Sequence, residues 1–130
     1  MSVDVYRQAL TTAVVFDRSA AGRVRVTGRD RLDFLHRLST QDLKALPAGR
    51  VASTILTTPI ARIVDRIDVL NLGEDLLLLT GIGRSTAVRK WLTGYIFFRD
   101  EVRLLDVAGE RGELVLVGPA AEPVLGAALP

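Results

Sequence analysis

The sequence predicts an α+β fold with a largely antiparallel sheet and about three helices. Short β-branched segments outnumber the segments with helical periodicity, and several of these strands are separated only by tight turns. Short connections favour antiparallel neighbours, because a parallel pair needs a crossover of about a dozen residues or more. At 130 residues the chain is expected to form one domain, residues 1–130, with a single core.

The first third of the chain is predicted to contain two helices and two strands. The first dozen residues form a short helix, which leads into a brief strand at Ala13–Asp17. A turn at Ser19–Gly22 precedes an alternating strand at Arg23–Val26. Thr27–Asp30 resembles a capping box, in which a hydroxyl and a later acid satisfy free backbone donors, so the next helix begins there. The core-facing arc of that helix contains Leu32, Phe34, Leu35 and Leu38.

The middle of the chain is predicted to contain three strands and another helix. The strands cover Val51–Thr58, Arg62–Leu70 and Leu76–Leu79. The last of them is wholly apolar, as expected for a central strand that is buried on both sides. Ser85 is expected to cap a helix. The core stripe of that helix contains Val88, Trp91, Leu92 and Tyr95.

The last part of the chain is predicted to contain two strands and an apolar helix. The strands at Val102–Val107 and Glu113–Val117 are joined by a turn at 108–112, and Pro119 is expected to open the helix. A helix that is almost wholly apolar needs cover on most of its surface. This apolar C-terminal segment therefore predicts a protein partner or self-association.

One acid lies on an otherwise apolar strand face. Successive side chains of a strand point to opposite faces, and one face of the strand at 62–70 contains Ile63, Asp65, Ile67 and Val69. The other face contains Asp68 beside Arg66 and is expected to be solvated. A carboxylate on a dry face must accept hydrogen bonds, take up a proton, or line a cavity that holds a polar ligand. Asp65 is therefore a candidate site residue, although pairing with an arginine would explain it structurally.

The composition excludes several classes of function. The net charge is +2, and the 15 arginines and two lysines are interleaved with acids, whereas nucleic-acid binding needs a clustered basic face. No apolar run approaches the ~20 residues that cross a bilayer, and the start of the chain lacks the layout of a signal peptide. Without cysteine the chain has no disulfide, thiol nucleophile or thiolate metal site. We expect a cytoplasmic protein that binds no nucleic acid, membrane or metal.

Three weaker signals favour structural roles. His36 is the only histidine and has no partner for a catalytic triad or a metal site, so it is expected at the margin of the core. Gly81-Ile82-Gly83 lies between a strand and a helix as a phosphate-binding turn would, but Thr86 stands in place of the third glycine. A plain turn is therefore favoured. Trp91 and Tyr95 are expected to be core residues rather than a stacking platform for a ring.

Three stretches resemble the motifs of one superfamily. Val24–Leu43 resembles V-x-G-x-D-R-x-x-F-L-x-x-L-[ST]-[TN]-[QN]-D, and Thr57–Asp65 resembles N-P-x-G-R-[IV]-[IL]-D. Both motifs are those of the folate-binding superfamily of the glycine-cleavage aminomethyltransferase (T-protein) and the YgfZ-type folate-binding proteins. Tyr95–Val102 is similar to Y-x-x-R-x-x-V, which is more typical of the YgfZ branch. The chain thus resembles the first part of the aminomethyltransferase folate-binding domain and is expected to be an incomplete N-terminal portion of it.

The resemblance implies a tetrahydrofolate site. In the superfamily the acid that ends the hairpin motif contacts the pterin of tetrahydrofolate, and Asp65 matches it. A carboxylate in a dry pocket can accept hydrogen bonds from ring N–H groups or stabilise a developing positive charge, so Asp65 is also the expected catalytic residue. Arg62 and Thr58 precede it in the hairpin and are expected to help bind the folate. Two positions depart from the pattern: Arg66 follows the acid, and Ala61 replaces the glycine of the turn, which is expected to alter that turn.

Three functions are compatible with the resemblance. The leading hypothesis is a tetrahydrofolate-binding protein of the YgfZ type, which by resemblance supports iron–sulfur enzyme maturation or repair. The alternative is an aminomethyltransferase that moves a one-carbon unit to tetrahydrofolate. Arg66 and the Tyr95–Val102 segment favour the first of these over the second. The third hypothesis is a truncated, non-catalytic module that needs a partner, which the apolar segment from Pro119 favours.

Overall fold

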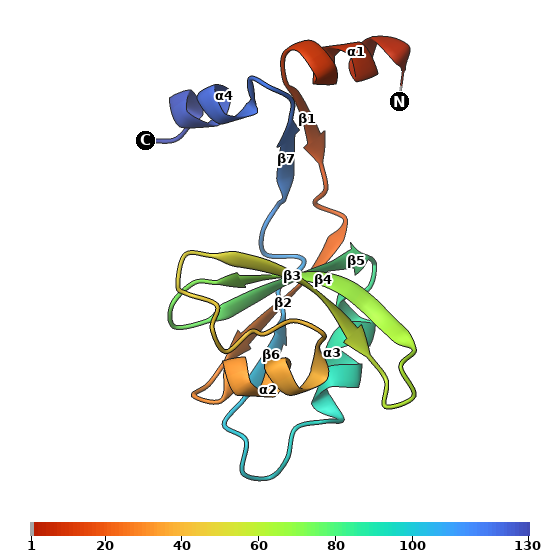
Figure 1. Ribbon diagram of the computed structural model, residues 1–130, viewed down its shortest axis with the longest axis vertical. Coiled ribbons are helices and arrows are strands. Elements are labelled where there is room, and N and C mark those ends of the chain that lie inside the picture. Colours follow the sequence, from red (N-terminus) through yellow and green to blue (C-terminus); the bar gives the residue numbers. More distant parts are fainter. Residues whose placement is uncertain (1) are drawn as a thin grey trace. The chain divides into compact units, whose positions relative to one another are not determined.

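The computed structural model describes residues 2–130, which divide into two compact units (Figure 1). The larger unit is Ala20–Arg111, and the smaller unit combines the two ends of the chain, up to Ser19 and from Gly112. The described residues contain four helices and seven strands, and every strand pair is antiparallel. The predicted α+β class with an antiparallel sheet is therefore confirmed, with one helix more than the expected number of about three.

The larger unit is a five-stranded sheet with two helices. Its strands are β2 (Ala21–Thr27), β3 (Val51–Thr57), β4 (Ile63–Asn71), β5 (Leu76–Ile82) and β6 (Arg103–Asp106). They follow the order β3-β4-β5-β2-β6, so β5 is central as predicted. The helices α2 (Arg31–Leu38) and α3 (Ser85–Thr93) lie on the same face of the sheet (Figure 1).

The core of this unit lies between the sheet and the two helices. Each strand contributes alternate side chains to it, as a pleated strand must. The buried apolar side chains come from the strands (Val24, Val26, Leu56, Ile67, Val69, Leu76, Leu78), the helices (Phe34, Leu35, Val88, Leu92) and the loop after α2 (Leu43). Trp91 and Tyr95 pack against this cluster, with ring centroids 4.7 Å apart, which confirms that they are core residues.

Two details of β4 and β5 differ from the prediction. Leu77 and Leu79 are only half-buried, so β5 is fully buried on one face rather than on both. Ile63, predicted on the dry face, is 69% exposed. The cause is an irregularity in the β3–β4 register, in which Leu56 pairs with Asp65 but Thr57 pairs with Ile63. One extra residue on β4 forms a β-bulge, and the bulge interrupts the alternation of faces beyond Asp65.

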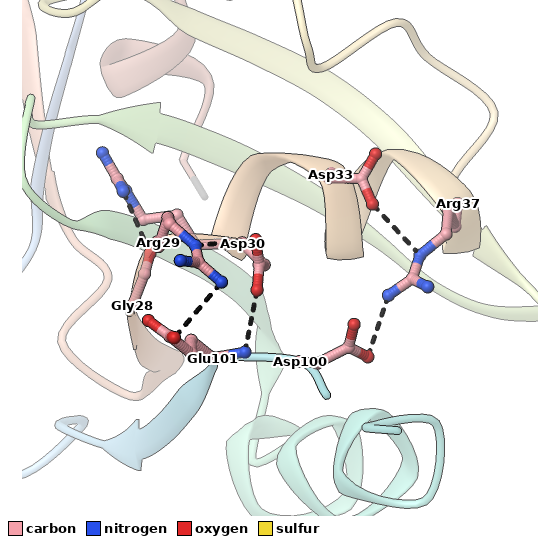
Figure 2. A network of polar contacts seen from close by, with 8 residues as sticks. Gly28, Arg29, Asp30, Asp33, Arg37, Asp100 and Glu101 are labelled. Atoms are coloured by element: carbon pink, nitrogen blue, oxygen red, sulfur yellow. Dashed lines mark hydrogen bonds and ion pairs between the residues drawn. The ribbon is translucent and has the colours of Figure 1, made fainter. Parts of the chain in front are cut away.

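The predicted capping box at Thr27–Asp30 is wrong. Thr27 ends β2, and Asp30 is the N-cap residue of α2 but makes no side-chain hydrogen bond to its own helix. The Asp30 carboxylate instead accepts a hydrogen bond from the Glu101 N–H at 2.9 Å. Asp30, which the sequence pattern predicts to be a local cap, therefore joins α2 to the segment that precedes β6 (Figure 2).

Asp106 holds the first turn of α3 against β6. Ser85 is the first residue of α3 rather than its N-cap, which is Arg84. The hydroxyls of Ser85 and Thr86 donate to Asp106 Oδ2 at 2.8 and 3.2 Å, and the Ala108 N–H donates to Oδ1 at 3.1 Å. The Ala108 N–H, followed by the two hydroxyls, holds the pKa of Asp106 below its ordinary value, although partial burial opposes this.

Acid is therefore expected to weaken the attachment of α3. A carboxyl whose pKa is lower in the folded chain stabilises the fold above its unfolded pKa of about 3.9, and the contribution is lost as the pH falls through the folded pKa. The free energy of unfolding should fall more steeply between about pH 5 and pH 2 in the wild type than in Asp106→Asn. The pKa values of Asp33 and Asp100 are also lowered, but both acids are present in the wild type and in Asp106→Asn, so they do not contribute to the difference between the two. Urea titrations with the same pH dependence in both would contradict the prediction.

The smaller unit pairs the two ends of the chain. It contains α1 (Val3–Thr11), β1 (Val14–Asp17), β7 (Leu114–Val117) and α4 (Ala121–Ala128). The predicted strands before and after the turn at 108–112 both form, but they do not pair with each other, since β6 pairs with β2 and β7 with β1. The last helix begins at Ala121 rather than at Pro119, and Val124 and Leu125 on it are exposed. Within residues 2–130, no helix has both the length and the apolar character required to span a bilayer.

Candidate functional site

Asp65 lies on the core face of β4, where the buried part of that strand ends. It pairs with Leu56 of β3, which is fully buried, and its own side chain is half-buried. Directly paired residues of antiparallel strands share a face. Asp65 therefore continues the face of Ile67 and Val69, as the alternation predicts, and stands at the edge of the core instead of inside it.

The backbone of β5 holds one oxygen of the Asp65 carboxylate. The Gly81 N–H donates to Asp65 Oδ2 at 3.1 Å. Throughout residues 2–130, no other donor lies within hydrogen-bond distance of this carboxylate and no arginine pairs with it. Arg84, which follows β5, donates instead to the Val64 carbonyl at 3.0 Å. The arginine partner that would explain Asp65 structurally is therefore absent from residues 2–130, and the Asp65 Oδ1 can accept a hydrogen bond from a ligand.

Gly81 allows β5 to approach this carboxylate closely. A Cβ at position 81 would lie 3.0 Å from Arg84 Cγ and 3.5 Å from Asp65 Oδ1. Because the Gly81 N–H is bonded to Asp65 and the Gly83 N–H to the Ala20 carbonyl, the turn does not present these donors to a phosphate. Gly81-Ile82-Gly83 is the plain strand-to-helix turn that was favoured, with an added role in fixing the acid.

Thr58 and Arg62 close the hairpin turn before the acid. The Thr58 N–H donates to the Arg62 carbonyl at 2.8 Å, and the Arg62 N–H donates to Thr58 Oγ1 at 3.1 Å. The Thr58 hydroxyl is thus engaged within the turn. The Arg62 side chain makes no ion pair within the described residues, and neither residue has a polar contact with Asp65 there. The structure therefore brings Thr58 and Arg62 together through their backbone and the Thr58 hydroxyl, and it leaves the Arg62 guanidinium exposed.

Ala61 keeps the backbone conformation that favours glycine. Its φ is 59°, in the left-handed region, and its N–H donates to the Thr58 carbonyl at 2.9 Å. The tight turn therefore forms with alanine in the left-handed conformation that glycine adopts more readily. An L-residue other than glycine pays about 1–2 kcal/mol for this conformation.

Replacing Ala61 with glycine is expected to stabilise the chain by about 0.5–1 kcal/mol, because the relief of strain exceeds the added entropy of the unfolded chain. The measurement is the urea-induced unfolding of both chains. Ala52→Gly is the control, since Ala52 lies in β3 and glycine in a strand is expected to destabilise by roughly 0.5–1 kcal/mol. A loss of stability in both variants would contradict the left-handed assignment at Ala61.

His36 has the structural role that was predicted. It is half-buried near the end of α2, and its Nδ1 accepts a hydrogen bond from the Leu43 N–H at 3.3 Å. In the described part of the chain, no group of three His, Cys, Asp or Glu side chains could hold a metal ion. The candidate site is the Asp65 carboxylate with Gly81 beside it, whose N–H donates to Asp65 Oδ2. Gly81 was missed as a site residue because its signal, the G-x-G pattern, was interpreted only as a turn.

The comparisons identify the family. Residues 4–130 match the sequence model described as the GCVT N-terminal domain. This chain belongs to that family. The chain is 37% identical over 116 residues to the aminomethyltransferase of Geobacillus kaustophilus, a match that covers 88% of this chain and 31% of that protein. It is 34% identical over 114 residues to the aminomethyltransferase of Bacillus subtilis, covering 82% of this chain and 32% of that protein.

A solved structure has the same fold. The crystal structure of glycine cleavage system aminomethyltransferase T from Bartonella henselae superimposes with a TM-score of 0.88 at 27% sequence identity. The superposition covers 98% of this chain and 35% of that one. The GCVT N-terminal domain thus spans about a third of the length of the relatives that it matches. These relatives bear the name aminomethyltransferase, which favours the alternative hypothesis over the leading YgfZ hypothesis.

Proposed function

We propose that this domain contributes part of a tetrahydrofolate site of the aminomethyltransferase type, in which Asp65 contacts the folate. The observation that carries the proposal is the state of the Asp65 carboxylate. It is half-buried at the edge of an apolar core, its Oδ2 is fixed by the Gly81 N–H, and its Oδ1 has no donor in residues 2–130. A carboxylate in this state can accept hydrogen bonds from a ligand that offers N–H groups.

Tetrahydrofolate has the chemistry that this acceptor needs. Its pterin offers ring N–H groups and an amino group as donors, and when bound it supplies the nitrogens that take up a one-carbon unit. Asp65 would orient the pterin through Oδ1 and stabilise positive charge that develops nearby. We propose Arg62, with its exposed guanidinium, as a second contact, and Thr58 as the residue that fixes the turn on which Arg62 stands.

Binding, not turnover, is the property to test first, because the chain spans about a third of its relatives. Anaerobic calorimetry with tetrahydrofolate, in reducing buffer, is expected to give saturable binding with one site per chain. Circular dichroism of the same sample establishes that the chain is folded. A folded chain that releases no binding heat on titration with tetrahydrofolate would contradict a self-sufficient site.

A YgfZ-type role is the second candidate. The Tyr95–Val102 segment and Arg66 after the acid are the features that favour it. Such a protein would bind folate without transferring a one-carbon unit, and its loss would lower the activity of iron–sulfur enzymes in the cell. Folate binding together with one-carbon transfer would decide for the aminomethyltransferase function. Folate binding without one-carbon transfer, together with lower activity of iron–sulfur enzymes in cells that lack the protein, would decide for the YgfZ-type role. We propose the cytoplasm as the place of either function.

A module that needs a partner is the third candidate. The exposed apolar side chains Val124, Leu125 and Leu129 at the end of the chain favour it. In that case tetrahydrofolate would bind only after the partner is added. Light scattering on the isolated chain tests this, because a monodisperse monomer that binds folate has no need of a partner.

A further inference from the structure

The strands β4 and β5 stop pairing before they reach the candidate acid. Their register ends at the pair of Asp68 and Leu79. β4 begins before this pair, at Ile63, and β5 continues beyond it, to Ile82. Asp65 therefore lies on a part of β4 that, within the described residues, has no partner on β5. Where the ladder is missing, the relative position of the two strand ends depends on other contacts.

Two reciprocal hydrogen bonds take the place of the missing ladder. The Asp65 side chain of β4 accepts from the Gly81 N–H of β5 at 3.1 Å. In the opposite direction, Nη2 of Arg84, which follows β5, donates to the Val64 carbonyl of β4 at 3.0 Å. Each strand end thus contributes one side chain and one backbone group. Because each hydrogen bond restricts a distance and an angle, the two together fix the strand ends relative to each other.

Val64, which Arg84 holds, is the extra residue of the β-bulge. The register between β3 and β4 passes from Asp65 directly to Ile63, so Val64 has no partner residue on β3 in the described chain. A bulge leaves such a residue outside the ladder and re-aims the side chains next to it. The bond from Arg84 to the Val64 carbonyl therefore holds the bulge, and the bulge sets the direction of the next side chain, that of Asp65.

The backbone of Arg84 is itself held in place. Its N–H donates to the Gly81 carbonyl at 3.0 Å, and its carbonyl accepts from the Val88 N–H at 2.9 Å. Gly83, with a φ of 67°, supplies the left-handed residue that this turn needs. A Cβ at position 81 would lie only 3.0 Å from Arg84 Cγ, so the stem of the arginine lies against Gly81. Arg84 thus extends from a fixed backbone past the residue whose N–H binds Asp65.

We propose that Arg84 is a positioning residue for Asp65. By holding the bulge at Val64, it keeps Asp65 Oδ2 on the Gly81 N–H and leaves Oδ1 for the ligand. The position of the carboxylate does not depend on any ligand, whereas its consequence for folate binding rests on the proposed function. Arg84 acts through a single N–H on a backbone carbonyl, so the ammonium group of lysine, which is also a donor, can replace it.

The test is the hydrogen bond between Gly81 and Asp65 in the ligand-free chain. In ¹³C,¹⁵N-labelled protein, a scalar coupling through this bond joins the Gly81 amide nitrogen to the Asp65 carboxyl carbon, and the coupling falls steeply as the bond lengthens. We expect the coupling in the wild type and its loss in Arg84→Met, which removes the donors but keeps an unbranched stem beside Gly81. Arg84→Lys restores a donor and should retain the coupling. Arg50→Met removes a guanidinium before β3, at the end of the sheet away from Asp65, and should leave the coupling unchanged.

Tetrahydrofolate affinity of the same variants is the second measurement, with circular dichroism to establish that each is folded. Arg84→Met is expected to weaken binding about tenfold, and Arg84→Lys should bind nearly as the wild type does. A folded Arg84→Met chain that keeps the full coupling would overturn the role of Arg84. An Arg84→Lys chain that loses the coupling as completely as Arg84→Met would overturn it too. An Arg84→Met chain that loses the coupling but keeps its folate affinity would support the positioning of Asp65 and contradict only its contact with the folate.

Discussion

Replacing Gly28 with alanine is expected to destabilise the larger unit severely. Gly28 has a φ of 107°, and an added Cβ would lie 2.0 Å from the Glu101 carbonyl oxygen and 2.7 Å from the Glu101 carbonyl carbon. Backbone atoms cannot rotate away as the end of a flexible side chain can, so segment 97–101 would have to leave α2. We expect the free energy of unfolding in urea to fall by at least about 3 kcal/mol, the upper end of the range for point variants.

Gly73→Ala is the matched control for this experiment. Gly73 has a φ of 95°, similar to that of Gly28, but a Cβ there would meet nothing within 4 Å. The loss of unfolding free energy in Gly73→Ala is therefore limited to backbone strain, about 1–2 kcal/mol. The difference between the two variants measures the close approach of Glu101 to Gly28. Equal losses would contradict the packing of segment 97–101 against the start of α2.

The largest effect on function is expected from Asp65→Asn. The amide oxygen of asparagine can still accept from the Gly81 N–H, so the fold should be retained. Its NH₂ group, however, would face the N–H donors of the pterin where a carboxylate oxygen now stands. Loss of a hydrogen bond to a charged group costs about 1.5–3 kcal/mol, so tetrahydrofolate affinity should fall roughly 10- to 150-fold in anaerobic calorimetry.

Asp68→Asn controls for the loss of a negative charge on the same strand. Asp68 lies on the other face of β4, where it accepts from Ser53 Oγ at 2.5 Å and lies 3.9 Å from Arg66. The Asp68→Asn variant is expected to bind tetrahydrofolate with the affinity of the wild type. Equal losses in Asp65→Asn and Asp68→Asn would mean that net charge, and not the Asp65 carboxylate, governs binding.

The strands, the core and the face of Asp65 could be predicted because each depends on a local pattern. Alternation along 62–70 placed Asp65 with Ile67 and Val69, and the stripe on α3 placed Trp91 and Tyr95 in the core. These patterns follow from the two periods of regular structure, which are properties of neighbouring residues. The bulge beside Asp65 has no such signal, so the exposure of Ile63 was not foreseen.

The partners of the acids could not be predicted, because they depend on strand order and register. Asp65 and Gly81 are 16 residues apart and meet through the pairing of β4 with β5. Asp30 and Glu101 are 71 residues apart, and the local pattern at Thr27–Asp30 favoured a capping box that does not form. The motifs identify the superfamily correctly, whereas the choice between its branches depends on only two features, Arg66 and the segment Tyr95–Val102.

The contact between Asp65 and the folate can be tested most directly through the amide of Gly81. Because this N–H donates to Asp65 Oδ2, its nuclear magnetic resonance signal reports any group that binds the same carboxylate. On anaerobic titration of the ¹⁵N-labelled chain with tetrahydrofolate, the Gly81 signal and those of the Thr58–Arg62 turn are expected to shift together and to saturate. The signals of the Gly28 and Glu101 amides should not shift. Saturable shifts confined to residues 97–103, with an unmoved Gly81 signal, would contradict a folate site at Asp65.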